Sequence, residues 1–317
     1  MKPIFAVALL TALALAVAGC GSGRKGAATT ARAATTAQHV GPAVVVVQRG
    51  YLVAFPLDGS KSDRLAKLPG PALEPAVSPD GSMVAFATNS GISTMRIDGS
   101  DIRAVTHHRY DGTPSWSTDG RRLYFVRGCG SIFSVAASGD GLQRIIAPGK
   151  WQEYEDPAVS PDGTRIAFTD WDSHCEAAGT ESPRLAVVDL DGQPTGDLKK
   201  LARNGYYPDP EHASPAWSPD GTQIAFGDNG DLAVANRDGT DERILIRGGM
   251  WTYVHYGDAP AWSPDGAWIA VTRRRRNAEG VATVEIVHPD GSNRRVIARM
   301  VNPGLEPGPL AGWLPDS

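Results

Sequence analysis

The sequence is poor in the groups and motifs that identify many enzymes. It has 3 cysteines among 317 residues, a formal net charge of -4, and 7% aromatic residues. This near-neutral charge carries no electrostatic footprint for nucleic acid, so we expect no nucleic-acid partner. Gly-x-Ser-x-Gly, P-loop and His-Glu-x-x-His patterns are missing. We therefore predict no catalytic residue, no metal and no cofactor, and of enzyme and non-enzyme we favour the non-enzyme.

Long apolar runs are rare as well, and the one at Ile4–Val17 is too short to span a bilayer comfortably. It follows Lys2 and ends in Val17-Ala18-Gly19-Cys20, which resembles the lipobox of bacterial lipoproteins. We predict a signal peptide over residues 1–19 and a lipidated Cys20, which places the protein extracytoplasmically, anchored on the periplasmic or cell-surface side of a bacterial membrane. The alternative is an ordinary secretory signal with an incidental cysteine.

Residues 20–40 have nothing to bury. After Cys20 they consist mainly of Gly, Ala and Thr, a composition typical of a flexible tether. We interpret residues 41–317 as one domain.

That domain is organised by a repeat of about 40 residues. Each copy contains Pro-x-x-Ser-x-Asp-Gly followed by a short apolar run such as Ile224-Ala225-Phe226. The copies are Pro75–Gly81, Pro114–Gly120, Pro157–Gly163, Pro215–Gly221 and Pro260–Gly266, with an incomplete sixth at Trp313–Asp316.

Each repeat predicts four short strands, which we name A to D. A turn such as Pro219-Asp220-Gly221 separates strands A and B, and a second Asp-Gly turn separates C and D. The second turns are Asp58-Gly59, Asp98-Gly99, Asp191-Gly192, Asp238-Gly239 and Asp290-Gly291, with a looser Ser138–Gly141 in the third repeat.

Four antiparallel strands per repeat and six repeats predict an all-β, six-bladed β-propeller. Blade 1 has strands B to D at Val44–Gln48, Tyr51–Pro56 and Arg64–Leu68, but no strand A before them. We expect Leu310–Leu314, near the C-terminus, to join blade 1 as its strand A and to close the ring.

The motif Pro-Ala-Trp-Ser-Pro-Asp-Gly-x-x-Ile-Ala-Phe resembles the WD-like repeat of TolB and of the propellers attached to prolyl oligopeptidase-type enzymes. The resemblance covers residues 41–317 and implies the six-bladed TolB-like architecture. It says little about function, because this fold carries many functions. In TolB the family's role is to bind other envelope proteins.

The repeated residues themselves have structural interpretations. The Asp-Gly turns do not have the ligand spacing of an EF-hand loop, so we interpret them as turns rather than calcium sites. Alternation along strand A predicts that five of its residues pack between blades rather than stack on a ligand: Val77, Trp116, Val159, Trp217 and Trp262.

All long insertions fall on the face opposite these turns. Long loops often carry function, and aromatic side chains suit binding surfaces. We predict a binding surface on this face, although the rings could instead pack on neighbouring loops. Its candidate residues are Trp151, Tyr154, Glu155, Asp156, Tyr206, Tyr207, His212, Trp251, Tyr253, His255 and Tyr256.

Charged residues on this face leave two interpretations open. Acidic residues before strand A could form a ring that holds a cation or a basic partner segment, or could be solvated loop carboxylates: Glu74, Asp111, Glu155, Asp156, Glu211 and Asp258. Arg273–Arg276 is interpreted as part of a solvated hairpin loop, with an anion or lipid head-group site as the alternative.

Cys129 and Cys175 fall in B–C loops of adjacent blades on the same face. Once Cys20 is lipidated they are an even pair in an oxidising compartment, and we predict a disulfide between them.

Three functions stay open. The favoured one is a monomeric, lipid-anchored envelope scaffold that binds a protein or peptide. The second is an envelope lyase or hydrolase acting on a glycan or peptide, with acid and base groups among Glu155, Asp156, Glu211, His212 and His255. The third is a receptor for a glycan or small ligand, with Trp151 and Trp251 stacking on it.

Overall fold

The computed structural model has 23 β-strands in six antiparallel sheets among the residues it describes. These are residues 41–70, 73–150, 152–171, 184–190, 213–228, 230–248, 259–274, 281–301 and 310–316. Within these ranges no helix is long and apolar enough to cross a membrane.

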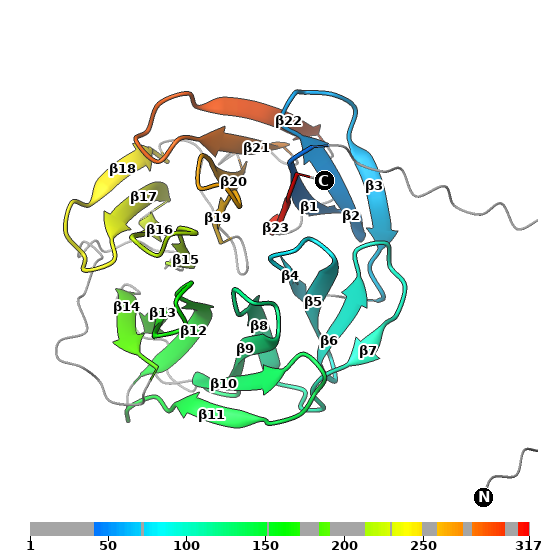
Figure 1. Ribbon diagram of the computed structural model, residues 1–317, viewed down its shortest axis with the longest axis vertical. Coiled ribbons are helices and arrows are strands. Elements are labelled where there is room, and N and C mark those ends of the chain that lie inside the picture. The colour runs from blue at the N-terminus through cyan, green and yellow to red at the C-terminus, as the bar shows by residue number, and fades with distance from the viewer. Residues whose placement is uncertain are drawn as a thin grey trace, which may run out of the picture. The chain divides into compact units, whose positions relative to one another are not determined.

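The six sheets are blades arranged around a central axis (Figure 1). From the axis outwards, blades 1 and 2 consist of β23 (Leu310–Leu314), β1 (Ala43–Gln48), β2 (Tyr51–Pro56), β3 (Asp63–Lys67), and of β4 (Leu73–Val77), β5 (Met83–Thr88), β6 (Gly91–Arg96), β7 (Arg103–Ala104). Blades 3 and 4 consist of β8 (Asp111–Trp116), β9 (Arg122–Arg127), β10 (Ser131–Ala136), β11 (Gln143–Ile146), and of β12 (Glu153–Val159), β13 (Arg165–Trp171), β14 (Arg184–Asp189). Blades 5 and 6 consist of β15 (Ala216–Trp217), β16 (Gln223–Asp228), β17 (Asp231–Asn236), β18 (Arg243–Ile246), and of β19 (Ala261–Trp262), β20 (Ile269–Arg274), β21 (Val281–Val287), β22 (Arg295–Val301).

The propeller predicted from the repeats is confirmed. β23 pairs with β1, so the strand nearest the C-terminus completes blade 1. This pairing gives β1 its inner partner and closes the ring. Blade 4 shows three strands within the described residues, because the segment that follows β14 lies outside them.

The apolar run on each B strand explains how the blades pack. In β16, Ile224 and Phe226 pack in a cluster with blade 4, whereas Ala225 between them packs in a cluster with blade 6. Side chains alternate between the two faces of a strand, so the large residues face one neighbouring blade and the alanine faces the other. The same alternation in the other blades gives six hydrophobic clusters, one at each junction.

Four tryptophans on the innermost strands also bond across the junctions. Each indole Nε1–H donates to a backbone carbonyl of the preceding blade, at distances of 2.8–3.1 Å. The pairs are Trp116 to Ala76, Trp217 to Ala158, Trp262 to Ala216 and Trp313 to Ala261. The prediction that strand A tryptophans belong to the packing between blades is confirmed.

The repeated A–B turns share one hydrogen-bond pattern. In blade 5, Ser218 Oγ donates to Asp220 Oδ1 at 2.6 Å, the backbone N–H of Thr222 donates to the same oxygen, and the N–H of Gln223 donates to Ser218 Oγ. The bonds from Ser218 and Thr222 stabilise the charged carboxylate and lower the pKa of Asp220. The serine and aspartate of the motif are therefore turn residues, as predicted.

Candidate functional site

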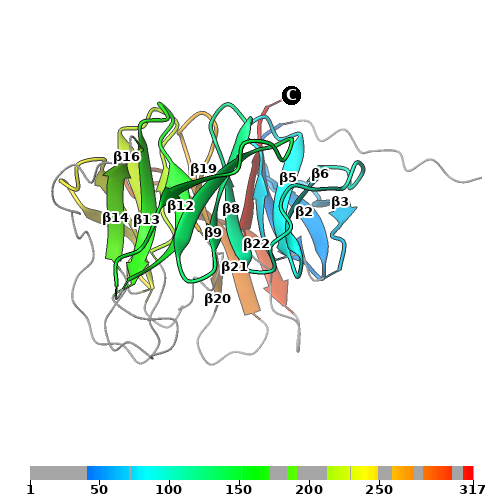
Figure 2. The same cartoon turned by 90° about the horizontal axis from the view of Figure 1, so that it is seen from below.

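Two faces of the ring can now be defined. The turn face carries the A–B turns, from Ser78–Gly81 to Ser263–Gly266, and the mouth face is the opposite one, where the innermost strands begin. Figure 2 shows the ring from the side, with the strands of each blade crossing its thickness between these faces. Most residues of the long insertions predicted for the mouth face lie outside the described residues.

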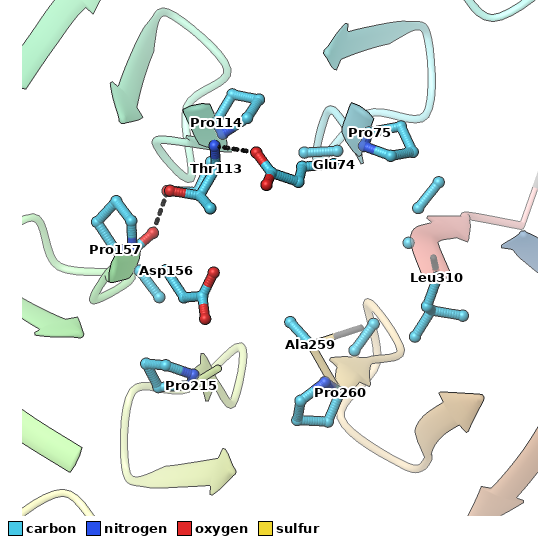
Figure 3. A pocket seen from close by; sticks show the side chains of 16 residues that line it. Glu74, Pro75, Thr113, Pro114, Asp156, Pro157, Pro215, Ala259, Pro260 and Leu310 are labelled. Atoms are coloured by element: carbon cyan, nitrogen blue, oxygen red, sulfur yellow. Dashed lines mark hydrogen bonds between the residues drawn. The ribbon is translucent and has the colours of Figure 1, made fainter. Parts of the chain in front are cut away.

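A cavity of about 150 Å³ lies in the central channel, among the innermost strands. Its wall comes from residues in the innermost strand of every blade or within two residues before it (Figure 3). Proline recurs at the start of this wall in five blades: Pro75, Pro114, Pro157, Pro215 and Pro260. The cavity therefore draws on all six blades and is bounded mainly by proline and alanine.

The residue before this proline has an unusual backbone in four blades. Glu74, Thr113, Asp156 and Ser214 have φ angles of 50°, 45°, 51° and 39°. The left-handed region is uncommon for residues other than glycine, and a following proline restricts the backbone further. The strand register shifts at this point in blades 2, 3 and 4. Such bulges change the direction of a side chain, and here they recur around one cavity.

Two carboxylates line the cavity, both carried by these left-handed residues. Glu74 Oε2 accepts the backbone N–H of Thr113 from the neighbouring blade. Asp156 Oδ2 accepts the hydroxyl of Ser214 at 2.7 Å, again across a blade junction. Figure 3 shows both carboxylates on one side of the cavity, with Thr113 between them. Of the six acidic residues considered for a ring, these two line the cavity.

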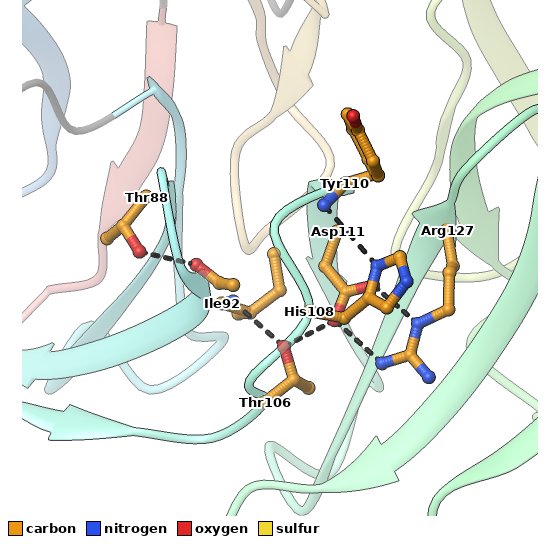
Figure 4. A network of polar contacts seen from close by, with 8 residues as sticks. Thr88, Ile92, Thr106, His108, Tyr110, Asp111 and Arg127 are labelled. Carbon is orange, nitrogen blue, oxygen red and sulfur yellow. Dashed lines mark hydrogen bonds and ion pairs between the residues drawn. The ribbon is translucent and has the colours of Figure 1, made fainter.

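Asp111, which the sequence placed in the same acidic ring, lies in a different environment. It is 3% exposed, and its oxygens accept two guanidinium N–H groups of Arg127 at 2.6 and 2.8 Å and the hydroxyl of Thr106 at 2.6 Å. Figure 4 shows this network inside blades 2 and 3. The Asp111 carboxylate raises the pKa of Arg127. Asp111 is thus a structural ion-pair partner, and the expectation that it lines the mouth is wrong.

His108 lies at the surface of this network. Its Nδ1 is 3.6 Å from Asp111 Oδ1, and its ring is tilted against that of Tyr110 at 5.9 Å between centroids. His107 and His108 are adjacent in the loop before β8. Across the described residues, no three side chains of His, Cys, Asp or Glu are grouped so as to hold a metal ion.

Of the predicted surface residues, Tyr154 and Glu155 lie in β12. Tyr154 is 6% exposed, its ring packs 4.6 Å from that of Phe168, and burial raises its pKa. Its ring is therefore a core group of the junction between blades 3 and 4, which corrects the expectation of an exposed ring. Glu155 accepts the indole N–H of Trp171 at 2.7 Å.

The other predicted residues lie outside the described residues. They are Cys20, Trp151, Cys175, Tyr206, Tyr207, Glu211, His212, Trp251, Tyr253, His255, Tyr256 and Asp258. Glu155 and Asp156 are thus the described members of the acid and base set suggested for an enzyme. Cys129 is exposed in the turn between β9 and β10, and its pairing with Cys175 stays a prediction.

Arg273 differs from its interpretation as a solvated loop residue. It is 6% exposed at the end of β20, donates to the carbonyls of Arg247 and Gly248 at 3.0 Å, and lies 3.6 Å from the carboxylate of Glu285. The pairing of β20 with β21 continues through Arg274. The first two residues of the basic run Arg273–Arg276 therefore belong to the sheet. Burial lowers the pKa of Arg273.

Sequence reasoning missed the backbone at the cavity. The available signal was variation among the repeats: the proline recurs, whereas the residue before it is Glu74, Thr113, Asp156 or Ser214. A left-handed residue in this position could not be inferred, because a residue before proline is expected to be extended.

Comparisons with known proteins agree with the fold. No protein-family model matches the sequence. A TolB homolog of Chlorobium luteolum is 27% identical over 155 residues, which cover 44% of this chain and 31% of that protein. The chain thus matches less than a third of the length of this curated relative.

Solved structures share the architecture at low sequence identity. TolB from Acinetobacter baumannii superposes with a TM-score of 0.60 and 21% identity, covering 86% of this chain and 66% of that one. An oligogalacturonate lyase in complex with manganese reaches a TM-score of 0.52 at 15% identity, covering 81% and 72%. Since such likeness concerns the fold alone, the conclusion is structural: this chain carries a TolB-like six-bladed β-propeller.

Proposed function

We propose that this protein is a lipid-anchored, extracytoplasmic scaffold that binds a protein or peptide partner at its mouth face. The observation that carries the proposal is the cavity in the central channel, to which all six blades contribute. Concave sites with apolar walls and a few placed polar groups are typical of binding sites. The name of the TolB homolog and the TolB-like fold are consistent with a partner in the cell envelope.

Backbone strain supports the same face. Left-handed residues other than glycine cost on the order of 1–2 kcal/mol each, and strained residues cluster at functional sites. Glu74, Thr113 and Asp156 adopt this conformation side by side around the cavity. The predicted aromatic residues other than Tyr154 would extend the surface around this centre.

Photo-cross-linking in cells tests the proposal. Exposed apolar residues of similar accessibility lie on both faces: Leu73 and Tyr110 (56% and 57%) on the mouth face, Ile102 and Leu142 (54% and 48%) beside turns of the turn face. We expect p-benzoylphenylalanine at Leu73 or Tyr110 to capture a discrete envelope protein that probes at Ile102 and Leu142 do not. Equal capture from both faces, or none from the mouth face, would refute the proposal.

The anchor and the disulfide are tested separately. Metabolic labelling with an azido fatty acid should mark the wild-type protein and not the Cys20→Ser variant. Non-reducing mass spectrometry should find a peptide that links Cys129 to Cys175. Two alkylatable thiols in the mature protein would exclude the disulfide.

A further inference from the structure

We propose that the exposed loop of residues 107–110, between blades 2 and 3 on the mouth face, docks an acidic segment of the partner protein. This inference rests on the proposed function, because it names the chemistry of the segment that the mouth face binds. The loop exposes two imidazoles, one guanidinium and one phenol ring, with no carboxylate among them.

The loop is held in one conformation by the groups around it. Thr106 and Asp111, which flank it, are buried, and the Thr106 hydroxyl donates to Asp111 Oδ2 at 2.6 Å. The backbone N–H of Asp111 donates to the carbonyl of His108 at 3.0 Å, and the N–H of Gly128 in blade 3 donates to the carbonyl of Tyr110 at 2.9 Å. Because the loop is already ordered, its backbone loses little entropy when it binds a partner.

The charge of the loop favours an anionic partner. Asp111 lies below the loop, and its charge is balanced by Arg127, which donates to both of its oxygens. Arg109 makes no ion pair among the described residues, and its guanidinium lies 4.5 Å from the centroid of the Tyr110 ring. Stacking on a ring leaves the N–H donors at the guanidinium edge available. Arg109 thus carries a positive charge without a described counter-charge, which carboxylates of a partner would complement.

Apolar groups beside this charge favour a protein segment over other anions. Tyr110 is 57% exposed, and Figure 4 shows its ring pointing away from the polar network. Leu73, which begins the innermost strand of blade 2 on the same face, is also exposed. Tyrosine and arginine are enriched at the residues that dominate protein interfaces, and a free anion would gain nothing from a phenol ring. A membrane surface is typically recognised by clusters of about four to eight Lys or Arg, whereas this loop has a single arginine.

Short peptides provide the probe while the partner is unidentified. They are acetyl-Glu-Glu-Leu-Glu-Glu-amide and its analogue with glutamine in place of each glutamate, titrated into the purified full-length protein at low ionic strength and followed by saturation-transfer NMR. We expect the acidic peptide to bind with a dissociation constant on the order of 1 mM. The glutamine peptide, which has the same shape without the charge, should bind at least about fivefold more weakly. Added salt should weaken the acidic peptide, because the loop is exposed to solvent.

Two variants locate the binding. Arg109→Gln removes the charge of the loop and Tyr110→Ser removes its ring, and each should weaken the acidic peptide at least about threefold. The matched control is Arg144→Gln, an exposed arginine on β11, the outer strand of blade 3, which should leave binding unchanged. Both loop side chains are exposed, so the variants are expected to fold, and thermal unfolding checks this. Either loop variant alone suffices if the other is unfolded.

Several results would overturn the inference. They are equal binding of the glutamine peptide, binding that survives both loop variants, and inorganic phosphate binding as tightly as the acidic peptide. Vesicles of phosphatidylglycerol that bind through Arg109, without binding of the peptide, would assign the loop to a membrane surface instead.

These outcomes are distinct from failure of the proposed function. If cross-links form at Leu73 but the acidic peptide does not bind, the scaffold stands and the acidic docking site falls. If the peptide binds through Arg109 but no partner is captured from the mouth face, the preference of the loop for acidic segments stands and the proposed function falls.

Discussion

The turn face and the mouth face are built from the same repeats but differ in regularity. On the turn face, the Ser Oγ to Asp Oδ1 bond measures 2.6 Å in each of five blades. The bond from the N–H two residues after the aspartate measures 3.0 Å in each of the same blades. On the mouth face, the residue before the repeated proline is different in every blade, and the cross-junction bonds of Glu74 and Asp156 have no copy elsewhere among the described residues.

This difference separates what the repeat stabilises from what it leaves to vary. Residues that recur in every blade satisfy backbone groups in turns and fill the junctions. Residues that vary sit where the chain accepts strain around a cavity. A repeat protein can therefore carry a specific site at the positions that depart from its own repeat.

The largest expected effect concerns the buried ion pair on the mouth side. Asp111→Asn would leave the Arg127 guanidinium, 20% exposed, without its counter-charge. Breaking a buried pair in this way costs about 3–5 kcal/mol. Chemical denaturation should report that loss in the free energy of unfolding.

Its control is an exposed pair of the same type. Asp101 and Arg103 are 2.8 Å apart, but their side chains are 40% and 71% exposed. Asp101→Asn should change the free energy of unfolding by less than about 1 kcal/mol. Equal effects of the two variants would show that the Asp111 network contributes no more than a surface pair.

A smaller effect is expected at the tryptophans that join blades. Trp262→Phe removes the Nε1–H bond to the carbonyl of Ala216 and part of the ring, which should cost about 1–3 kcal/mol. Trp268→Phe is the matched control: that ring packs against His288 and Arg295 within its own blade. Denaturation midpoints that fall equally for both variants would contradict a special role for the bond between blades.

The fold could be predicted from the sequence because the repeat occurs many times. Each Asp-Gly pair marks a turn, and each Φ-Ala-Φ run (Φ, a large apolar residue) marks a strand with two unlike faces, so errors at one copy are corrected by the others. Strands Tyr51–Pro56 and Leu310–Leu314 have the predicted bounds. Closure of the ring by β23 also followed, from the missing strand A of blade 1.

The site followed only in part, because it depends on single residues. The sequence places Glu74, Asp111 and Asp156 alike, just before a predicted strand A, so sequence position alone made them equivalent. The structure separates them: Arg127, which is distant in sequence, draws Asp111 into the interior. Glu74 and Asp156 differ from ordinary strand residues because their backbones are left-handed. Their hydrogen bonds to neighbouring blades stabilise this conformation.

A stabilising effect is expected where the mouth face is strained. Thr113 is β-branched, has φ 45°, and its buried Oγ1 has no hydrogen-bond partner among the described residues. Thr113→Gly removes both costs and keeps the N–H that bonds Glu74, so stability should rise by up to about 1 kcal/mol. Thr222→Gly, in an A–B turn where the hydroxyl bonds Asp220 at 2.8 Å, should destabilise instead. A loss of stability in Thr113→Gly would contradict the inference that the backbone of this face is strained.

The smallest expected effect is the acid response of the turn face. Bonds from the hydroxyl of Ser160 and from the N–H and hydroxyl of Thr164 lower the pKa of Asp162 to about 2, from 3.8. Since this pKa is lowered on folding, the stabilisation is present above pH 3.8 and is lost as the pH falls towards 2. Asp162 is almost fully solvated, so screening limits its share to a few tenths of a kcal/mol. The difference in unfolding free energy between wild type and Asp162→Asn should therefore be small at pH 6 and vanish near pH 2. A difference that stays constant over this range would show that the turn, not its charge, accounts for the stabilisation.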